Sequence, residues 1–149
     1  MIVLAFTLAA ALSQPPGRAR AAQPTTPPAM RTIDKGDHSN MDDVAQVAAK
    51  TPQEWQQLWQ KHTPDRPRPA VDFSKEMVVG VFLGSRPTAG YILEIVSAAQ
   101  DNGSLVVKYR ESIPHRGSMT AQVLTSPYHI VAVPFFAASV KFEKVPDGK

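Results

Sequence analysis

Two stretches of sequence decide the fold: residues 76–83 read EMVVGVFL, and residues 91–111 read YILEIVSAAQDNGSLVVKYRE. The first stretch is a nearly continuous apolar run, which is typical of a strand buried on both faces. In the second stretch, two β-like runs flank Asp101-Asn102-Gly103, which is a strong hairpin signal. The sequence therefore predicts a β-rich domain built around a buried strand and a hairpin.

The charges along the predicted hairpin favour one register. A two-residue turn at residues 102–103 would set Glu94 opposite Glu111, whereas a three-residue loop with Gly103 left-handed would set Glu94 opposite Arg110. Opposite charges across a strand pair stabilise it by a few tenths of a kcal/mol, and like charges destabilise it. We therefore expect the three-residue loop.

Other segments extend the β pattern. Further strands are predicted at residues 119–124, 128–133 and 139–144, and short β-like pieces occur at residues 30–33 and 44–47. Prolines separate the later strands, since proline cannot sit inside a central ladder. With one helix, these strands predict a mainly β protein: an antiparallel β-sandwich or a partly closed barrel with one short amphipathic N-terminal helix.

The helix signal is local and clear. Thr51-Pro52-Gln53-Glu54 places Thr at the N-cap, Pro at the first helical position and Glu three residues after the cap, which is a capping box. Trp55, Leu58, Trp59 and His62 then recur at helical spacing and form one apolar stripe. A helix of about three turns is marginal alone. We therefore expect it to dock on the sheet through its tryptophans.

The N-terminal segment has the pattern of an export signal. Residues 2–12 are apolar or small, a run shorter than the roughly 20 residues needed to span a bilayer. Ala19-Arg20-Ala21 then resembles a processing site. We expect a signal peptide at residues 1–21, a disordered Pro/Thr-rich linker at 22–29 and one β domain at 30–149. The expected location is the periplasm or the extracellular space, with membrane contact only transiently through the leader.

The charge distribution and the lack of cysteine exclude several classes of function. Residues 1–21 carry Arg18 and Arg20 and no acidic residue, so their removal takes the formal net charge from +3 to +1. Basic and acidic residues are interspersed, whereas nucleic-acid binders cluster Lys and Arg on one face. We therefore expect no nucleic-acid partner. The chain has no cysteine, which excludes disulfides, thiolate nucleophiles and Cys-ligated metals.

The sequence shows no signature of catalysis. It contains neither the G-x-S-x-G elbow of hydrolases nor the H-E-x-x-H motif of zinc proteases. No two of its four histidines are separated by two to four residues, the spacing that would place both on one metal. Ser, His and Asp are present, but their presence alone does not identify a triad. We expect a protein that is not an enzyme, without catalytic residues, metal or cofactor.

The most informative segment for function connects the two best strands. It reads Gly84-Ser85-Arg86-Pro87-Thr88-Ala89-Gly90-Tyr91 and is bounded by glycines. A rigid sheet commonly holds such a loop for recognition, and Arg and Tyr are suited to partner contacts. The predicted partner-binding residues are Arg86, Pro87, Thr88, Gly90 and Tyr91. The alternative is a plain strand connector whose glycines satisfy turn geometry.

Several segments together resemble one family, the PrcB C-terminal domain, which is named after a subunit of a bacterial protease complex. The matching residues are Glu54-Trp55…Leu58-Trp59…His62, Val71-Asp72-Phe73, Gly84-x-Arg86-x-Thr88-x-Gly90-Tyr91 and Thr125-x-Pro127-Tyr128-His129-Ile130-Val131. This resemblance implies an exported or envelope-associated domain whose namesake works in a protease assembly without being the protease.

A second resemblance concerns mechanism. Pro87-Thr88-Ala89-Gly90-Tyr91 is similar to the Pro-Thr-Thr-Gly-Tyr loop that chagasin-type inhibitors insert into papain-like proteases. The other two loops of that family, Gly-x-Gly-Gly and Arg-Pro-Trp, are missing from this sequence.

Three functional hypotheses follow from these patterns. The leading one is an exported, non-enzymatic protein-binding domain, with a protease as a candidate partner, that recognises its partner through residues 84–91. The alternatives are a chagasin-like protease inhibitor and a structural envelope protein without a dedicated site. The sequence does not define an oligomeric state.

Overall fold

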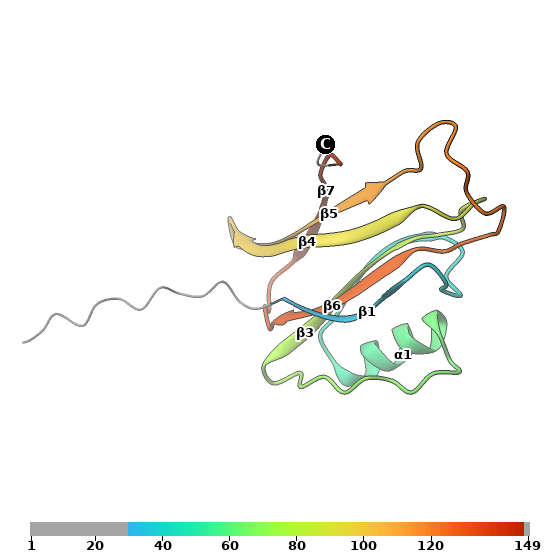
Figure 1. The fold of residues 1–149 in the computed structure, drawn as a ribbon. Coiled ribbons are helices and arrows are strands. Elements are labelled where there is room, and N and C mark those ends of the chain that lie inside the picture. Colours follow the sequence, from blue (N-terminus) through green and yellow to red (C-terminus); the bar gives the residue numbers. More distant parts are fainter. Residues whose placement is uncertain (1–29, 148–149) are drawn as a thin grey trace, which may run out of the picture.

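The computed structural model describes residues 30–147, which form three layers (Figure 1). The predicted signal peptide at residues 1–21 and the predicted linker at residues 22–29 lie outside the described residues. In chain order the elements are β1 (Arg31–Gly36), β2 (Val44–Ala49), α1 (Pro52–His62), β3 (Glu76–Leu83), β4 (Ile92–Asp101), β5 (Ser104–Ser112), β6 (Tyr128–Pro134) and β7 (Val140–Lys144). The prediction of a mainly β protein with one short helix is confirmed.

The strands form two sheets that face each other. The first sheet has the order β1-β6-β3-β2 and is antiparallel throughout, and the second has the order β4-β5-β7. In the second sheet β5 and β7 run parallel, so the sandwich is mixed and not purely antiparallel. Figure 1 shows α1 on one side of the first sheet and the second sheet on the other. The two described sheets do not close into a barrel.

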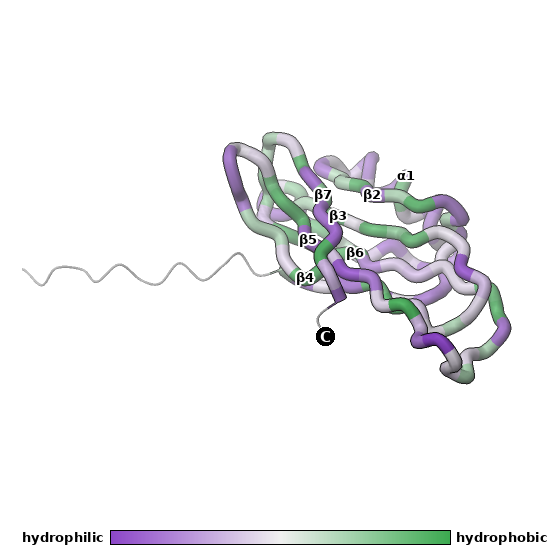
Figure 2. The backbone as a smooth tube through the Cα atoms, turned by 90° about the horizontal axis from the view of Figure 1, so that it is seen from above, coloured by the Kyte–Doolittle hydropathy of each residue, from purple (hydrophilic) through white to green (hydrophobic). Residues whose placement is uncertain are grey.

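Strand β3 lies at the centre of the three layers, as its apolar run predicts. Met77, Val79 and Val81 point into the core between the two sheets, and Val78 and Phe82 point toward α1. Because side chains alternate across a strand, an unbroken apolar run is what a strand covered on both faces requires. Figure 2 shows the hydrophobic stretches on the strands that form these layers.

Helix α1 begins as the capping box predicts. The Thr51 side chain accepts a hydrogen bond from the Glu54 N–H at 3.2 Å. The Glu54 carboxylate reaches one residue further back than the cap and accepts from the Lys50 N–H at 2.7 Å. The helix ends at Thr63, whose N–H donates to the Trp59 carbonyl oxygen, just before the helix-breaking Pro64.

The two tryptophans hold the segment that follows the helix. The indole Nε1–H of Trp55 donates to the Pro69 carbonyl oxygen at 3.0 Å, and that of Trp59 donates to the Arg66 carbonyl oxygen at 2.8 Å. Both rings are buried against the first sheet. Because a buried indole needs a partner for its N–H, the connector is fixed in place by the same side chains that dock the helix.

The hairpin has the predicted pairing but not the predicted turn. Glu94 lies opposite Arg110, as expected from their charges. Asp101 pairs with Ser104, however, so the loop consists of only two residues, Asn102 and Gly103, which both have positive φ. The three-residue loop was therefore wrong. A β-bulge between Ile95 and Ser97 shifts the register by one residue and brings Glu94 to Arg110.

The strand predicted at residues 119–124 is also wrong. This segment belongs to the connection between β5 and β6, and its ordered pairing is limited to an isolated bridge between Arg86 and Thr125 and one hydrogen bond from the Ala89 N–H to the Ala121 carbonyl oxygen. An alternating pattern forms a strand only where a neighbour supplies a ladder, and here the neighbouring chain is itself a loop. The other predicted strands are present, with ends shifted by a few residues.

Candidate functional site

The predicted binding loop, residues 84–91, joins β3 to β4 at one end of the sandwich. Gly84 has φ of +70°, and a Cβ atom there would lie 2.6 Å from the Asp42 carbonyl oxygen. Position 84 requires glycine, because the left-handed backbone and the close approach to Asp42 both exclude a side chain. This end of the loop is therefore fixed against residues 42–44.

Arg86 is committed to contacts within the protein. Its guanidinium pairs with the Glu111 carboxylate at 3.1 Å and lies over the Tyr91 ring at 5.6 Å. Glu111 also accepts from Lys144 at 2.7 Å. Burial alone would raise the pKa of Glu111, but the hydrogen bonds from Lys144 and Arg86 outweigh it and hold that pKa below its usual value. Arg86 and Tyr91 thus support the loop from inside.

The other predicted residues of the loop divide into buried and exposed positions. Thr88 is half-buried, and its carbonyl oxygen accepts a hydrogen bond from the Thr125 hydroxyl at 2.9 Å. Pro87 and Gly90 are exposed, and Tyr91 is half-buried. Among the predicted contact residues, Pro87 and Gly90 are therefore exposed to a partner, whereas Arg86, Thr88 and Tyr91 are partly covered by the protein itself.

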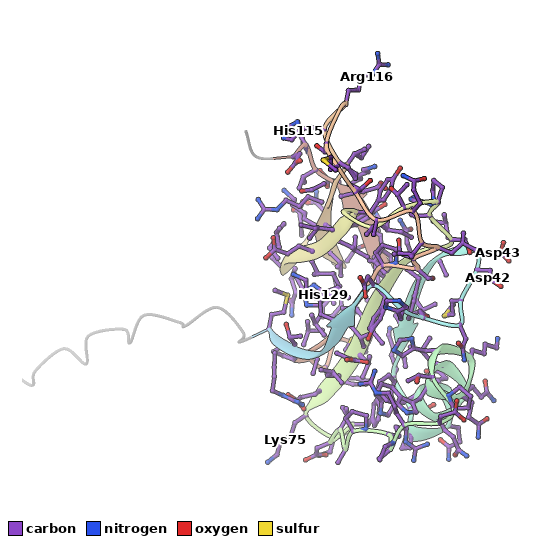
Figure 3. The ribbon with its side chains drawn as sticks, turned by 45° about the vertical axis from the view of Figure 1, so that its right-hand side comes forward. Asp42, Asp43, Lys75, His115, Arg116 and His129 are labelled. Carbon is purple, nitrogen blue, oxygen red and sulfur yellow. The ribbon has the colours of Figure 1, made fainter. Side chains whose placement is uncertain are left out.

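A second loop at this end carries exposed apolar side chains, and it includes residues 119–124, for which the sequence predicts a strand. Exposed fractions are 60% for Ile113, 103% for Met119, 50% for Val123 and 75% for Leu124. Residues 113–127 contain no acidic residue, and Figure 3 shows Arg116 pointing away from the body of the molecule. Loops of this length without secondary structure of their own are uncommon and are usually either functional or linker segments.

A third loop, residues 37–43, completes the end of the molecule. The Ser85 N–H donates to the Asp42 carbonyl oxygen at 2.9 Å, and the Ser126 N–H donates to the Asp37 carbonyl oxygen at 2.7 Å. Three segments far apart in sequence are thus hydrogen-bonded together. We call residues 37–43, 84–91 and 113–127 the loop end.

A polar cleft of about 460 Å³ opens at the loop end. Its walls come from the loop at residues 37–43, the C-terminus of α1, Arg66, Ser85 and residues 124–126. Leu124 is the one large apolar side chain among the lining residues. A cleft of this composition offers hydrogen-bonding and charged groups rather than an apolar surface.

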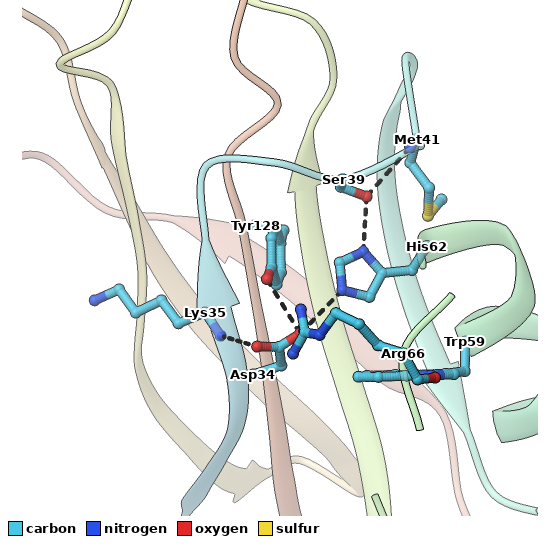
Figure 4. Close-up of polar contacts among 8 residues, drawn as sticks. All are labelled: Asp34, Lys35, Ser39, Met41, Trp59, His62, Arg66 and Tyr128. Atoms are coloured by element: carbon cyan, nitrogen blue, oxygen red, sulfur yellow. Dashed lines mark hydrogen bonds and ion pairs between the residues drawn. The ribbon is translucent and has the colours of Figure 1, made fainter. Parts of the chain in front are cut away.

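Two residues that line the cleft, Ser39 and His62, form a chain of three hydrogen-bonded side chains with Asp34 (Figure 4). The Ser39 Oγ lies 2.8 Å from Nδ1 of His62, and Nε2 of His62 lies 3.1 Å from Oδ2 of Asp34. The same carboxylate oxygen accepts from the Tyr128 hydroxyl at 3.1 Å and pairs with Arg66 at 3.0 Å. These residues come from β1, the following loop, α1, the connector after α1 and β6.

The surroundings set the protonation states of this chain. Burial lowers the pKa of His62, and the hydrogen bond and the negative charge of Asp34 only partly offset it, so the imidazole is neutral at neutral pH. Burial alone would raise the pKa of Asp34, but hydrogen bonds from Arg66, His62 and Tyr128 hold that pKa below its usual value. The site therefore contains a neutral imidazole and an ionised carboxylate.

Aromatic rings hold the imidazole in place. His62 is fully buried, with ring centroids 4.2 Å from Tyr128, 5.3 Å from Trp59 and 5.5 Å from Phe82. In the sequence, His62 stands out only as the last residue of the helix stripe and as part of the family resemblance. No spacing in the sequence connects it to Ser39 or Asp34, so the chain becomes visible only in the fold.

The described residues show neither a metal cluster nor a spanning helix. Within residues 30–147, no group of three or more His, Cys, Asp or Glu side chains is placed to hold a metal ion. In the same part of the chain, no helix has the length and apolar character needed to cross a bilayer.

Fold and site together define a small β-sandwich domain with a loop-built end, an architecture in which function is carried by the connections between strands. Over residues 77–134, from β3 to the end of β6, the chain matches the family model described as PrcB C-terminal, as the resemblance predicts for this part of the chain. Searches of curated proteins and of solved structures gave no significant match.

Proposed function

We propose that this protein is an exported, non-enzymatic protein-binding domain that recognises its partner through the loop end, with a protease as a candidate partner. The observation that carries the proposal is the exposure of Met119, Leu124, Val123 and Ile113 on one loop at the end where the predicted binding loop also lies. Exposed apolar side chains gathered in one place mark interaction sites.

Contacts between the loops order the surface of the loop end before any partner binds. Residues 84–91 are fixed by Gly84, Arg86 and Tyr91, and they in turn hold the second loop through the bridge to Thr125. A surface ordered before binding loses less conformational entropy on association. Burial of each large apolar side chain in a partner contributes roughly 1.5–3 kcal/mol, so a few of them suffice for specific recognition.

The test is crosslinked capture from the envelope fraction of the source cells, followed by mass spectrometry. Wild type is compared with a Met119→Ser/Leu124→Ser double variant and with Phe135→Ser. Phe135 is also exposed, but it follows β6 at the opposite end of the sandwich, where its N–H donates to the Lys75 carbonyl oxygen. We expect a partner that the loop variant loses and the Phe135 variant retains.

Two outcomes contradict the proposal. Identical capture by all three proteins removes the loop end from recognition, and the absence of any reproducible partner supports the structural envelope component instead. An Arg86→Ala/Tyr91→Ala variant is a poor probe for this purpose, because both side chains support the loop from inside and their loss would disturb its shape.

A protease inhibitor is the second candidate. It is favoured by residues 87–91, which resemble the inhibitory loop of chagasin-type proteins, and by the position of this loop beside two others at one end of a β-sandwich. Titration of papain-like and serine proteases with the protein tests it directly. The absence of inhibition at micromolar protein would contradict this role, and loss of inhibition in a Pro87→Ser variant would support it.

A further inference from the structure

We propose that Ser39 is an activated nucleophile, which reacts with activated acyl or phosphonyl esters that enter the polar cleft. Nucleophilic activation is recognised by a hydroxyl within hydrogen-bond reach of a base that a third group orients. Ser39, His62 and Asp34 meet this description, with heavy-atom distances of 2.8 Å and 3.1 Å. The inference goes beyond partner binding and does not depend on it.

The directions of the hydrogen bonds follow from the acceptors. The ionised Asp34 carboxylate can only accept, so Nε2 of His62 must carry the hydrogen and Nδ1 must present its lone pair. The Met41 N–H donates to the Ser39 Oγ at 3.2 Å. Because Nδ1 carries a lone pair and no hydrogen, it can only accept, so the Ser39 hydroxyl donates to it. The hydroxyl is therefore aligned to give its proton to the imidazole.

The base is also rigid and unprotonated. The rings of Tyr128 and Trp59 pack against His62 and fix its plane, and its position in the last turn of α1 fixes its backbone. Because burial lowers the pKa of His62, its neutral form, the one that can accept a proton, is already dominant at neutral pH. A preorganised base avoids the cost of reorientation during proton transfer.

A reagent can reach the hydroxyl. Ser39 is half-buried and lines the cleft of about 460 Å³ together with His62. Asn40, Thr63 and Arg66 line the same cleft and offer hydrogen-bond donors for the negative charge that develops on an attacked carbonyl or phosphoryl oxygen.

A fluorophosphonate reacts with Ser39 by displacement of fluoride at phosphorus. The Ser39 Oγ attacks phosphorus, the new O–P bond forms, and the P–F bond breaks with loss of fluoride. The hydroxyl proton passes to Nδ1 of His62 and from there to solvent. With p-nitrophenyl acetate, the Oγ attacks the carbonyl carbon, p-nitrophenolate leaves, and an acetyl ester remains on Ser39.

The adduct is expected to accumulate rather than turn over. The Asp34 carboxylate accepts from Arg66, Tyr128 and His62, and its other oxygen accepts from the Lys35 N–H at 3.1 Å. Its charge is therefore largely neutralised and stabilises an imidazolium less than a free carboxylate would. Attack on a reactive ester tolerates this loss, whereas hydrolysis of the resulting ester by water does not.

The experiment incubates the full chain with a fluorophosphonate probe and measures the intact mass, followed by peptide mapping. We expect one adduct, located on Ser39, and none in Ser39→Ala. The matched control is Ser112→Ala, which removes a half-buried serine that donates to the Asp147 carboxylate outside this cleft and should label like wild type. Labelling of wild type elsewhere than Ser39, or no labelling at all, overturns the proposal. The hydrogen bonds among Ser39, His62 and Asp34 would then have a structural role alone.

Two further measurements separate activation from mere exposure. Asp34→Asn, checked for folding by circular dichroism, places an amide that can donate to Nε2 of His62, which would leave the hydrogen on Nδ1. Labelling at Ser39 should then slow by roughly 100-fold, since general-base assistance contributes on the order of 100-fold or more. In wild type the labelling rate should level off near neutral pH. A rate that keeps rising about tenfold per pH unit, or an unchanged rate in Asp34→Asn, would indicate attack by free alkoxide and would overturn the proposal.

Discussion

Arg86 and Glu111 form an ion pair of 3.1 Å that fastens the loop between β3 and β4 to the second sheet. Glu111 retains 9% side-chain exposure and Arg86 retains 23%, so the pair is largely shielded from water. Because Lys144 also contacts Glu111, one buried carboxylate joins β5, the segment at the end of β7 and the predicted binding loop. The shape of the loop end thus depends on an interaction below its surface.

The first prediction concerns this pair. Arg86→Met keeps the aliphatic stem but leaves Glu111 with one cationic partner, so we expect the free energy of unfolding to fall by roughly 1–3 kcal/mol. The matched control is Arg110→Met, which breaks the more exposed pair with Glu94, where side-chain exposure is 39% and 38%. An exposed pair contributes about 0–1 kcal/mol. Urea denaturation measures both, and equal losses would contradict the assignment of Arg86 as an internal support.

The second prediction concerns the docking of α1. Trp59 is 3% exposed and packs on the first sheet, so Trp59→Ala should lower the free energy of unfolding by roughly 3–5 kcal/mol. The loss of its N–H bond to the Arg66 carbonyl oxygen should also loosen the connector. Gln57→Ala, on the exposed face of the same helix, should stay within about 0.5 kcal/mol of wild type. Thermal denaturation compares the two, and a small effect at Trp59 would mean that the helix is dispensable.

The parts of the fold that were predicted correctly depend on neighbours in sequence. The α1 boundaries follow from Thr51 and Pro52 at one end and Pro64 at the other, and its buried face follows from the spacing of apolar residues. Strand β3 follows from its unbroken apolar run. In each case the signal and the structure occupy the same short stretch, so no knowledge of distant contacts is required.

The parts that were missed depend on contacts between distant segments. The Ile95 N–H, beside the bulge in β4, donates to Nδ1 of His129 in the other sheet, a partner that no local pattern reveals. The pairing of Glu94 with Arg110 was right, but through this bulge and not through a longer turn. Likewise Ser39, His62 and Asp34 meet only because α1 packs on the sheet in which β1 is an edge strand. The predicted contact role of Arg86 remains a prediction.

The third prediction compares two glycines with similar backbone angles. Gly84 has φ of +70° and Gly103 has φ of +76°, but a Cβ atom at Gly84 would lie 2.6 Å from the Asp42 carbonyl oxygen, whereas one at Gly103 meets nothing within 4 Å. Alanine in the left-handed region costs roughly 1–2 kcal/mol at either position. We expect Gly103→Ala to show only this cost and Gly84→Ala to lose clearly more, as measured by chemical denaturation. Equal losses would show that residues 42–44 move aside freely.

The fourth prediction concerns acid stability and His129. Its Nδ1 accepts from the Ile95 N–H at 2.8 Å, and its Nε2–H is then available to the Thr32 hydroxyl at 2.9 Å. A proton on Nδ1 would face the Ile95 donor inside the core. Burial, helped by the nearby positive charge of Lys35, lowers the pKa of His129 from 6.5 to about 4.

The sign of the pH effect follows from these two pKa values. Above pH 6.5 the histidine is neutral in both the folded and the unfolded chain, and its contribution to stability is complete. As the pH falls from 6.5 toward 4, His129 becomes protonated in the unfolded chain but stays neutral in the folded chain, so the free energy of unfolding declines. Between about pH 7 and about pH 5 the expected loss is roughly 2 kcal/mol.

His129→Asn, which keeps an acceptor near the Ile95 N–H, should be less stable than wild type at neutral pH, but its free energy of unfolding should decline less steeply with acid. If His129→Asn lost stability with acid as steeply as wild type, the protonation of other groups would have to account for the decline.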